Sequence, residues 1–226
     1  MRTTIFTIIL VVGCIIQAAA QSLSGAYHTK INDIHHLLLF VDGYVTHTVY
    51  TDKEYHNTQG GTFNIENNTL IVHCEFDNKN PENVGKDHRF SISFQNNQLK
   101  VDEVAFDKKA THSQALDGLW RITGRKVNDN IQTMQRGNRK TLKLLIDGYF
   151  QWFAINPAEK GFYGTGGGNY TFQDGKYQEN ILFFSRDNSR VGVTLTFDGK
   201  IEEGQWHHSG KSSKGDPIYE IWSREK

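Results

Sequence analysis

The chain carries the same order of features twice, and this duplication constrains its fold more than any other feature. Leu116-Asp117-Gly118-Leu119-Trp120 opens the second half, and a near-copy, Leu23-Ser24-Gly25-Ala26-Tyr27, opens the first. Each copy is followed by an apolar run ending in Asp-Gly-Tyr, a double glycine, an aromatic run and a Val-Gly pair. Residues 60–85 align without a gap to residues 167–192. Two units are too few and too long for a solenoid, so we infer duplication of one domain.

Each half consists of short runs rich in β-branched and aromatic residues, separated by tight-turn signals. This pattern predicts an all-β chain with about seven strands in the first half and about eight in the second. Residues 126–138 are polar and are predicted to form a short helix or a flap. The predicted hairpin turns are Asp42-Gly43, Asn67-Asn68, Asn96-Asn97, Asp147-Gly148, Asp174-Gly175 and Asp198-Gly199.

Composition is that of packed domains without a broad charged surface. Hydrophobic residues make up 37% of the chain and aromatic residues 12%, which excludes a disordered chain. The formal net charge is +0, so nothing favours binding to nucleic acid or to an anionic membrane surface.

The N-terminus has the layout of a bacterial secretory signal peptide. Arg2 precedes the apolar residues 5–16, which are short for a membrane span, and Ala18-Ala19-Ala20 is a cleavage site. We therefore predict a signal peptide over 1–20, domains over 21–113 and 114–226, and a secreted or periplasmic location. Val11-Val12-Gly13-Cys14 leaves a lipoprotein anchored through Cys14 as the alternative, although Ile15-Ile16 follows where a polar tether is usual.

Sequence signals for catalysis, metals and cofactors are weak. Cys74 lies in an apolar run and is interpreted as a small buried hydrophobe. His35-His36 and His207-His208 are neighbours on predicted strands, so the two rings of each pair point to opposite faces and cannot chelate together. The glycine run 164–168 lacks the Lys and helix of a phosphate loop. No metal site and no cofactor is predicted.

The second half resembles the small secreted lipocalin-like proteins of Gram-negative bacteria. The residues that carry the resemblance are Gly118-x-Trp120, Arg224, Asp147-Gly148-Tyr149, Gly167-Gly168-Asn169-Tyr170 and Tyr177-Gln178-Glu179. The resemblance implies two tandem antiparallel up-and-down β-barrels of about seven to eight strands each. It also implies that Gly118, Trp120 and Arg224 close one end of the second barrel. The first half resembles these proteins more weakly: Tyr27 replaces the tryptophan, and Lys108 or Lys109 stands in the place of the arginine.

Strand alternation separates the candidate ligand-binding side chains into faces. Tyr149, Gln151 and Phe153 share one face, and Phe150, Trp152 and Ala154 share the other. Tyr177, Glu179, Ile181 and Phe183 form a further set. An inward Glu179 would require an arginine partner or would have a raised pKa, and an outward Glu179 with Tyr177 on the solvent side is the alternative. The predicted ligand-binding residues are Tyr149, Gln151, Trp152, Phe153, Tyr170, Tyr177 and Glu179.

The expected function is non-catalytic binding of a small apolar or amphipathic molecule in the mouth of the second barrel. We expect the shorter first barrel to be filled with side chains. For the second barrel, a filled interior and a hollow one remain alternatives. One alternative is a module with filled barrels that binds a protein or a glycan. The other is an enzyme that uses a carboxylate in the cavity, which requires two ionisable groups to converge there.

Overall fold

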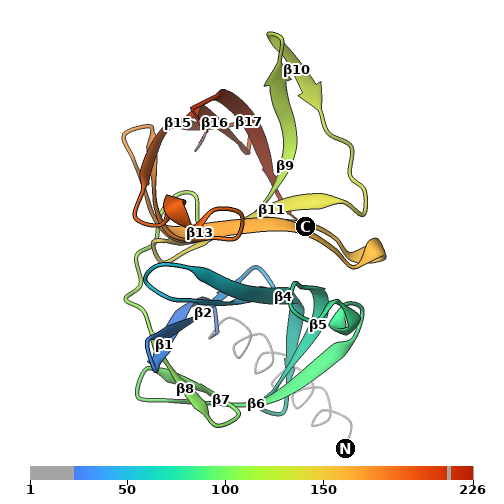
Figure 1. The fold of residues 1–226 in the computed structure, drawn as a ribbon, viewed down its shortest axis with the longest axis vertical. Helices are drawn as coiled ribbons and strands as arrows, with labels where there is room; N and C mark the ends of the chain where they lie inside the picture. The colour runs from blue at the N-terminus through green and yellow to red at the C-terminus, as the bar shows by residue number, and fades with distance from the viewer. Residues whose placement is uncertain (1–22, 213–214, 226) are drawn as a thin grey trace, which may run out of the picture.

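The protein consists of two eight-stranded antiparallel up-and-down β-barrels in tandem, as predicted (Figure 1). The structure is a computed structural model that describes residues 23–212 and 215–225. The predicted signal peptide and Cys14 lie outside the described residues. Within them, no helix has the length and apolar character needed to cross a membrane.

Barrel 1 is formed by β1 to β8, which follow one another around the barrel, and β1 closes it against β8. Its elements are β1 (Gly25–Ile31), β2 (Ile34–Val41), β3 (Tyr44–Tyr50), β4 (Tyr55–Glu66), β5 (Thr69–Asp77), the 3₁₀ turn η1 (Pro81–Asn83), β6 (Asp87–Gln95), β7 (Gln98–Val101) and β8 (Val104–Lys108).

Barrel 2 is closed by pairing of its first strand, β9, with its last, β17. Its elements are β9 (Gly118–Val127), β10 (Asn130–Thr133), β11 (Lys140–Ile146), β12 (Tyr149–Asn156), η2 (Pro157–Glu159), β13 (Gly161–Gln173), β14 (Lys176–Phe184), η3 (Asn188–Arg190), β15 (Thr194–Glu202), β16 (Gln205–Lys211) and β17 (Pro217–Arg224).

Most of the predicted hairpin turns are present, with residues in the left-handed conformation that two-residue turns require. The turn predicted at Asp198-Gly199 is wrong, because β15 runs through it and the chain turns at Glu203-Gly204 instead. Gly199 leaves space for a ring: a Cβ there would lie 2.9 Å from Phe172. This glycine therefore marks close packing within a strand.

The double glycines form β-bulges at equivalent places in both barrels. A Cβ on Gly61 would lie 1.9 Å from the carbonyl oxygen of His73, and one on Gly168 would lie 1.9 Å from that of Asn180. The bulge changes the alternation of β14. Phe183 consequently packs between the barrels, and Phe184 faces the interior of barrel 2, so the prediction that Phe183 shares the face of Glu179 is wrong.

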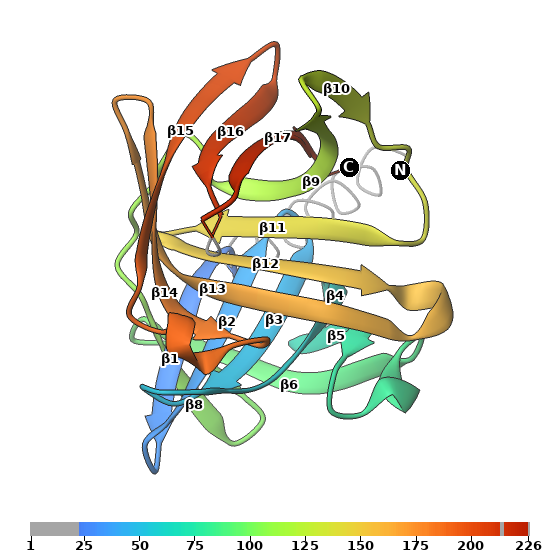
Figure 2. The same cartoon turned by 45° about the horizontal axis from the view of Figure 1, so that its top comes forward.

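The segment predicted as a short helix or flap is mainly a β-hairpin. β9 continues beyond the barrel wall, turns at Asn128-Asp129 and returns as β10. The hairpin projects from barrel 2, and residues 134–139 connect it to β11 (Figure 2). The left-handed Asn128 and Asp129 form a two-residue turn, which explains why this polar segment is not helical.

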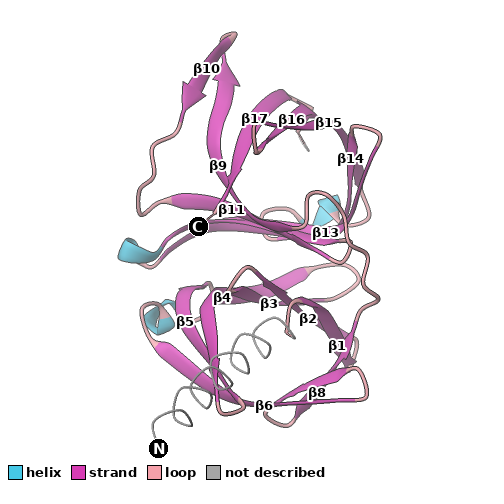
Figure 3. Cartoon of the chain, turned by 180° about the vertical axis from the view of Figure 1, so that it is seen from behind, coloured by secondary structure: helices cyan, strands magenta, loops and turns pink. Residues whose placement is uncertain are grey.

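The two barrels lie against each other (Figure 3). Buried apolar side chains from both barrels form one core between them. Phe153 of barrel 2 stacks on two rings of barrel 1, with centroids 4.8 Å from Phe76 and 5.6 Å from Tyr44. Tyr50 contacts Phe183 at 5.1 Å. The outer faces of β2, β3, β11 and β12 are therefore buried, which explains why β2, β11 and β12 carry apolar residues on both faces.

The aspartates of the repeated Asp-Gly-Tyr motif link the barrels reciprocally. Oδ2 of Asp42 in barrel 1 accepts a hydrogen bond from the backbone N–H of Leu119 in barrel 2, at 2.9 Å. Oδ2 of Asp147 in barrel 2 accepts one from the backbone N–H of Ala26 in barrel 1, at 3.2 Å. The repeated motif thus forms a hairpin turn, and its aspartate also accepts a hydrogen bond from a backbone N–H in the first strand of the other barrel.

Candidate functional site

One end of barrel 2 is closed by the side chains that open and end its sequence. The Arg224 guanidinium lies 3.9 Å from the centre of the Trp120 ring and donates to the backbone oxygen of Asp117. Trp120 Nε1 donates to the backbone oxygen of Leu116 at 2.7 Å. Gly118 permits this approach, since a Cβ there would lie 1.6 Å from Arg224 Nη1. In barrel 1 it is Lys108 that occupies the equivalent place, 5.8 Å from the Tyr27 ring.

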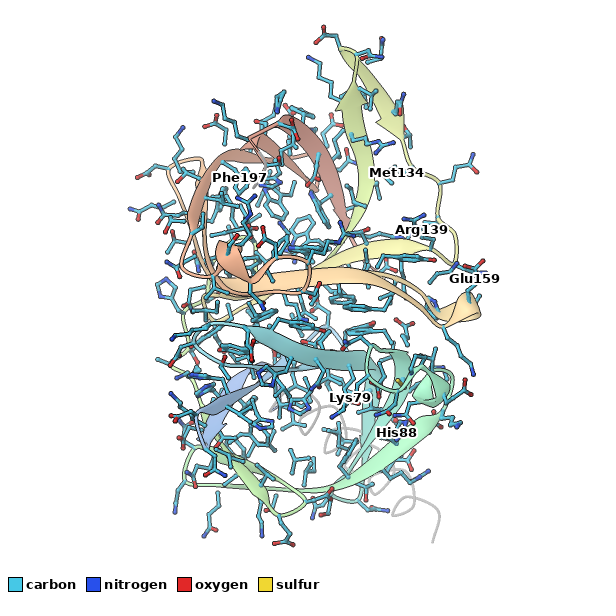
Figure 4. The ribbon with its side chains drawn as sticks, in the orientation of Figure 1. Lys79, His88, Met134, Arg139, Glu159 and Phe197 are labelled. Atoms are coloured by element: carbon cyan, nitrogen blue, oxygen red, sulfur yellow. The ribbon has the colours of Figure 1, made fainter. Side chains whose placement is uncertain are left out.

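Barrel 2 encloses a cavity of about 810 Å³ that opens away from this closed end. Its mouth is widened because β9 and β11 pair only from Gly118–Leu145 to Arg121–Leu142 and then separate. Met134 and Arg139, on the segment that bridges this gap, line the mouth (Figure 4). The apolar wall is formed by Ile122, Met134, Trp152, Phe184, Leu195 and Ile218, among others.

A buried ion pair lies at the base of the cavity. Lys143 Nζ is 3.0 Å from Glu179 Oε1, and both side chains are almost fully buried. The Tyr177 hydroxyl donates to the same carboxylate oxygen at 2.9 Å. The ammonium also lies 5.1 to 5.9 Å from four aromatic ring centres. Glu179 therefore faces inward, and the partner that compensates its burial is a lysine in an aromatic cage.

A second polar pair lies beside the first. His208 Nδ1 is 3.2 Å from Glu220 Oε2, which also accepts from Trp222 Nε1 at 3.1 Å. Burial lowers the pKa of His208, an effect that Glu220 only partly opposes. Burial alone would raise the pKa of Glu220, but its hydrogen bonds and the nearby Lys143 hold it below the ordinary value. The pair is thus a neutral imidazole that donates to a carboxylate.

Basic side chains dominate the rest of the lining. Seven basic residues line the cavity against two carboxylates, Glu179 and Glu220. Four of the basic side chains form ion pairs with carboxylates: Arg121, Lys140, Lys143 and Arg190. The other three, Arg125, Arg139 and Arg186, form no such pair with any residue that the structure describes. Arg139 stacks on Tyr163 at 4.4 Å, and Arg186 donates to the Tyr163 carbonyl.

Three of the predicted ligand-binding residues lie on the wrong side of the barrel wall. Tyr149, Gln151 and Phe153 share one face, as predicted, but that face packs on barrel 1. Gln151 is fully buried, donates to Thr58 and Thr165 at 3.1 Å each and accepts from Thr48 at 3.2 Å. The error arises because a single barrel would leave this face in solvent, whereas the second barrel covers it.

The other four predicted residues lie inside barrel 2. Trp152 and Glu179 line the cavity. Tyr170 and Tyr177 belong to the aromatic core below it, where the Tyr170 hydroxyl donates to Asp117 and burial raises the Tyr177 pKa far above its ordinary value. These two tyrosines therefore support the base of the cavity and do not form its surface.

The position of Gln151 leads to a test. Gln151→Leu should lower the free energy of unfolding by about 1 kcal/mol, because the hydroxyls of Thr48, Thr58 and Thr165 each lose one hydrogen bond while keeping another. Binding of any molecule in the barrel 2 cavity should be unchanged, since Gln151 faces away from it. Urea unfolding and calorimetric titration measure the two effects. Weakened binding with unaltered stability would contradict this placement.

Sequence reasoning missed Lys143 and the arginines at the mouth. A signal for Lys143 is present, since it is the one charged residue in the apolar run Leu142-Lys143-Leu144-Leu145-Ile146. In the repeat alignment Lys143 corresponds to Leu38 and Glu179 corresponds to Val72. Both apolar counterparts line a cavity in barrel 1. The two barrels thus place a charged pair and an apolar pair at equivalent positions.

Barrel 1 is hollow, so the expectation of a filled core is wrong. Its cavity measures about 340 Å³ and is lined mainly by aliphatic and aromatic side chains, with His36, His47 and His88 among the polar ones. Burial lowers the pKa of His47 to about 4. Cys74 lies in the wall, where burial raises the pKa of its thiol to about 11. Cys74 is a small buried residue, as predicted.

The predicted orientation of the histidine pairs is also observed. His36 points into barrel 1 toward His47, at 3.1 Å, whereas His35 points outward to His28 and Asp52. Among the described residues no group of three or more His, Cys, Asp or Glu side chains could hold a metal ion. The glycine run 164–168 is part of β13 and includes its bulge.

Comparison with models of protein families finds no match, and comparison with curated proteins finds none either. The fold and the geometry of the two cavities therefore carry the functional argument.

Proposed function

We propose that the protein is a non-catalytic, secreted binding protein that holds a small amphipathic molecule in the cavity of barrel 2. The observation that carries the proposal is the cavity itself, whose volume of about 810 Å³ lies in the range of small-molecule sites. Apolar side chains form much of its wall, and polar groups converge at its base and mouth. The resemblance to secreted lipocalin-like proteins, based on Gly118, Trp120 and Arg224, agrees with this role.

Binding energy would come mainly from the apolar wall. Burial of apolar ligand surface contributes about 25 cal/mol per Å². Trp152 and Phe184, whose ring centres lie 5.7 Å apart, offer flat surfaces for a ring or an acyl chain. The polar groups would then set the orientation of the ligand.

The converging ionisable groups at the base favour binding over catalysis. The Glu179 carboxylate is occupied by Lys143 and Tyr177. His208 uses Nδ1 for Glu220, and its Nε2, the nitrogen that would have to reach a substrate, is buried and has no hydrogen-bond partner among the described residues. A general base needs an available lone pair within hydrogen-bond reach of its substrate, whereas one oxygen of Glu179 is already engaged by two donors and His208 Nε2 is buried.

The cavity of barrel 1 supports a second candidate site. It is smaller and apolar, and Asp102 is the one acidic or basic side chain, histidines apart, among its lining residues. It suits an uncharged apolar molecule or an alkyl chain. A protein- or glycan-binding module with filled barrels is a weaker proposal, because both interiors are hollow.

The proposal is tested by filling the cavity of barrel 2. Ala154 lines the cavity, and Ala154→Trp should reduce the affinity for an amphipathic probe such as anilinonaphthalene sulfonate at least tenfold, measured by calorimetric titration. Ala105→Trp, on the exposed surface of β8, is the matched control and should leave binding unchanged. Extraction and native mass spectrometry of the purified protein should also reveal a co-purifying lipophile. Equal binding by wild type and both variants would contradict the proposal.

A further inference from the structure

We propose that the molecule held in barrel 2 is an anion with an apolar body, and that Arg125, Arg139 and Arg186 recognise its charged group. This inference rests on the proposed function and specifies its ligand. Carboxylate, sulfate, sulfonate and phosphate groups share the chemistry that these guanidinium groups would recognise.

The excess of positive charge is specific to this cavity. The whole chain has a formal net charge of +0, yet basic side chains outnumber carboxylates seven to two in the lining of barrel 2. The cavity of barrel 1, built by the same strand order, has no lysine or arginine among its lining residues. A cavity with low-dielectric walls concentrates the field of such charges and raises the local concentration of an oppositely charged ligand.

The available charge lies at the mouth and not at the base. Lys143 is neutralised by Glu179, and Glu220 carries the second negative charge of the lining. Arg125 is exposed on β9 and has no partner among the residues that the structure describes. Arg139 and Arg186 are both exposed and contact the same residue, Tyr163, one on its ring and one at its carbonyl oxygen. Their remaining N–H groups are free to donate to an anion.

The apolar wall below these arginines determines the other half of the ligand. A bare inorganic anion would leave Ile122, Trp152 and Phe184 uncovered, whereas an anion with a ring or alkyl body would bury them. The Glu220 carboxylate at the base forms no ion pair with a lysine or arginine that the structure describes, so its negative charge opposes deep entry of an anionic group. We therefore place the apolar body in the barrel and the anionic group at its mouth.

The experiment compares two probes that differ in one charged group. Anilinonaphthalene sulfonate is anionic, and phenylnaphthylamine is its neutral counterpart. The triple variant Arg125→Gln, Arg139→Gln, Arg186→Gln should bind the anionic probe at least tenfold more weakly than wild type, because charge-assisted hydrogen bonds are lost. Its affinity for the neutral probe should change less than twofold. Affinity for the anionic probe should also fall as salt increases.

Three controls decide the result. The triple variant Lys53→Gln, Lys79→Gln, Arg89→Gln removes the same charge from the surface of barrel 1 and should not weaken binding of the anionic probe. Arg125→Gln alone removes a side chain that forms no hydrogen bond or ion pair within the part of the chain that the structure describes, and should give a smaller loss of the same kind. Inorganic sulfate, at matched ionic strength, should not displace the probe.

Three outcomes would overturn the inference. The arginine variant could lose as much affinity for the neutral probe as for the anionic one, the two triple variants could lose equal affinity for the anionic probe, or sulfate alone could displace the probe. These outcomes leave the proposed function intact, provided that binding of the neutral probe is still blocked by Ala154→Trp. If neither probe responds to Ala154→Trp, both the inference and the proposed function fail.

Discussion

Lys143→Met should lower the free energy of unfolding of barrel 2 by about 3–5 kcal/mol, the cost of leaving a buried charge without its partner. Glu179 would keep only the hydrogen bond from Tyr177. All four tryptophans, Trp120, Trp152, Trp206 and Trp222, lie in the second half of the chain, so their fluorescence reports on barrel 2 during urea unfolding. The midpoint should shift to markedly lower urea.

The companion variant replaces the whole pair with its counterparts from barrel 1. Lys143→Leu with Glu179→Val introduces the residue types that Leu38 and Val72 supply there. Stability should return close to that of wild type or exceed it, because a buried ion pair contributes little beyond its own desolvation cost. Lys176→Met, in an exposed ion pair with Asp198, is a control that should have little effect. A double variant less stable than Lys143→Met would contradict this account.

If the double variant is stable, the ion pair is retained for a reason other than folding. In barrel 2 the pair lies at the base of the cavity, and in barrel 1 its apolar equivalents line a smaller cavity. The simplest physical difference between the barrels is then the polarity of their interiors. Under the proposed function, duplication produced two barrels of one architecture whose cavities differ in polarity and would accept different molecules.

The fold could be predicted because local signals agree with it. Two-residue turns with left-handed Asn and Asp, the double glycines and the apolar runs each specify β-structure independently. The prediction of a turn at Asp198-Gly199 is wrong, because a glycine required for close packing against Phe172 cannot be told in the sequence from a glycine required for a turn.

The candidate site was predicted less well, for two physical reasons. Alternation shows that Gln151 and Trp152 lie on opposite faces, but it cannot show which face the other barrel covers. The arginines at the mouth come from β9, the segment before β11 and the segment after β14, which are far apart in the chain. These arginines line one cavity because the barrel closes and because β9 separates from β11. No local sequence pattern predicts either feature.

Gly118→Ala should destabilise barrel 2 by about 3 kcal/mol, through backbone strain and loss of the closing stack. Gly118 has a φ of +136°, which L-residues rarely adopt, and a Cβ there would lie 1.6 Å from Arg224 Nη1. The guanidinium would have to leave the Trp120 ring, where it now lies 3.9 Å from the ring centre. Thermal and urea unfolding measure the loss, and a change in tryptophan fluorescence of the folded protein reports the displaced guanidinium.

Gly25→Ala separates the two contributions to this loss. Gly25 has nearly the same φ, +139°, but the nearest atoms to its Cβ would be Asp147 Oδ2 at 2.9 Å and Lys108 Cε at 3.1 Å. Lys108 can shift, whereas Asp147 would have to loosen its hydrogen bond from the Ala26 N–H. Neither contact is as close as the one at Gly118, so this variant should show the strain with a smaller packing loss. Combining Gly118→Ala with Arg224→Ala should cost less than the sum of the single changes, because the clash and the stack involve the same guanidinium. Additive losses would show that Gly118 is required for its backbone conformation alone and not to admit Arg224.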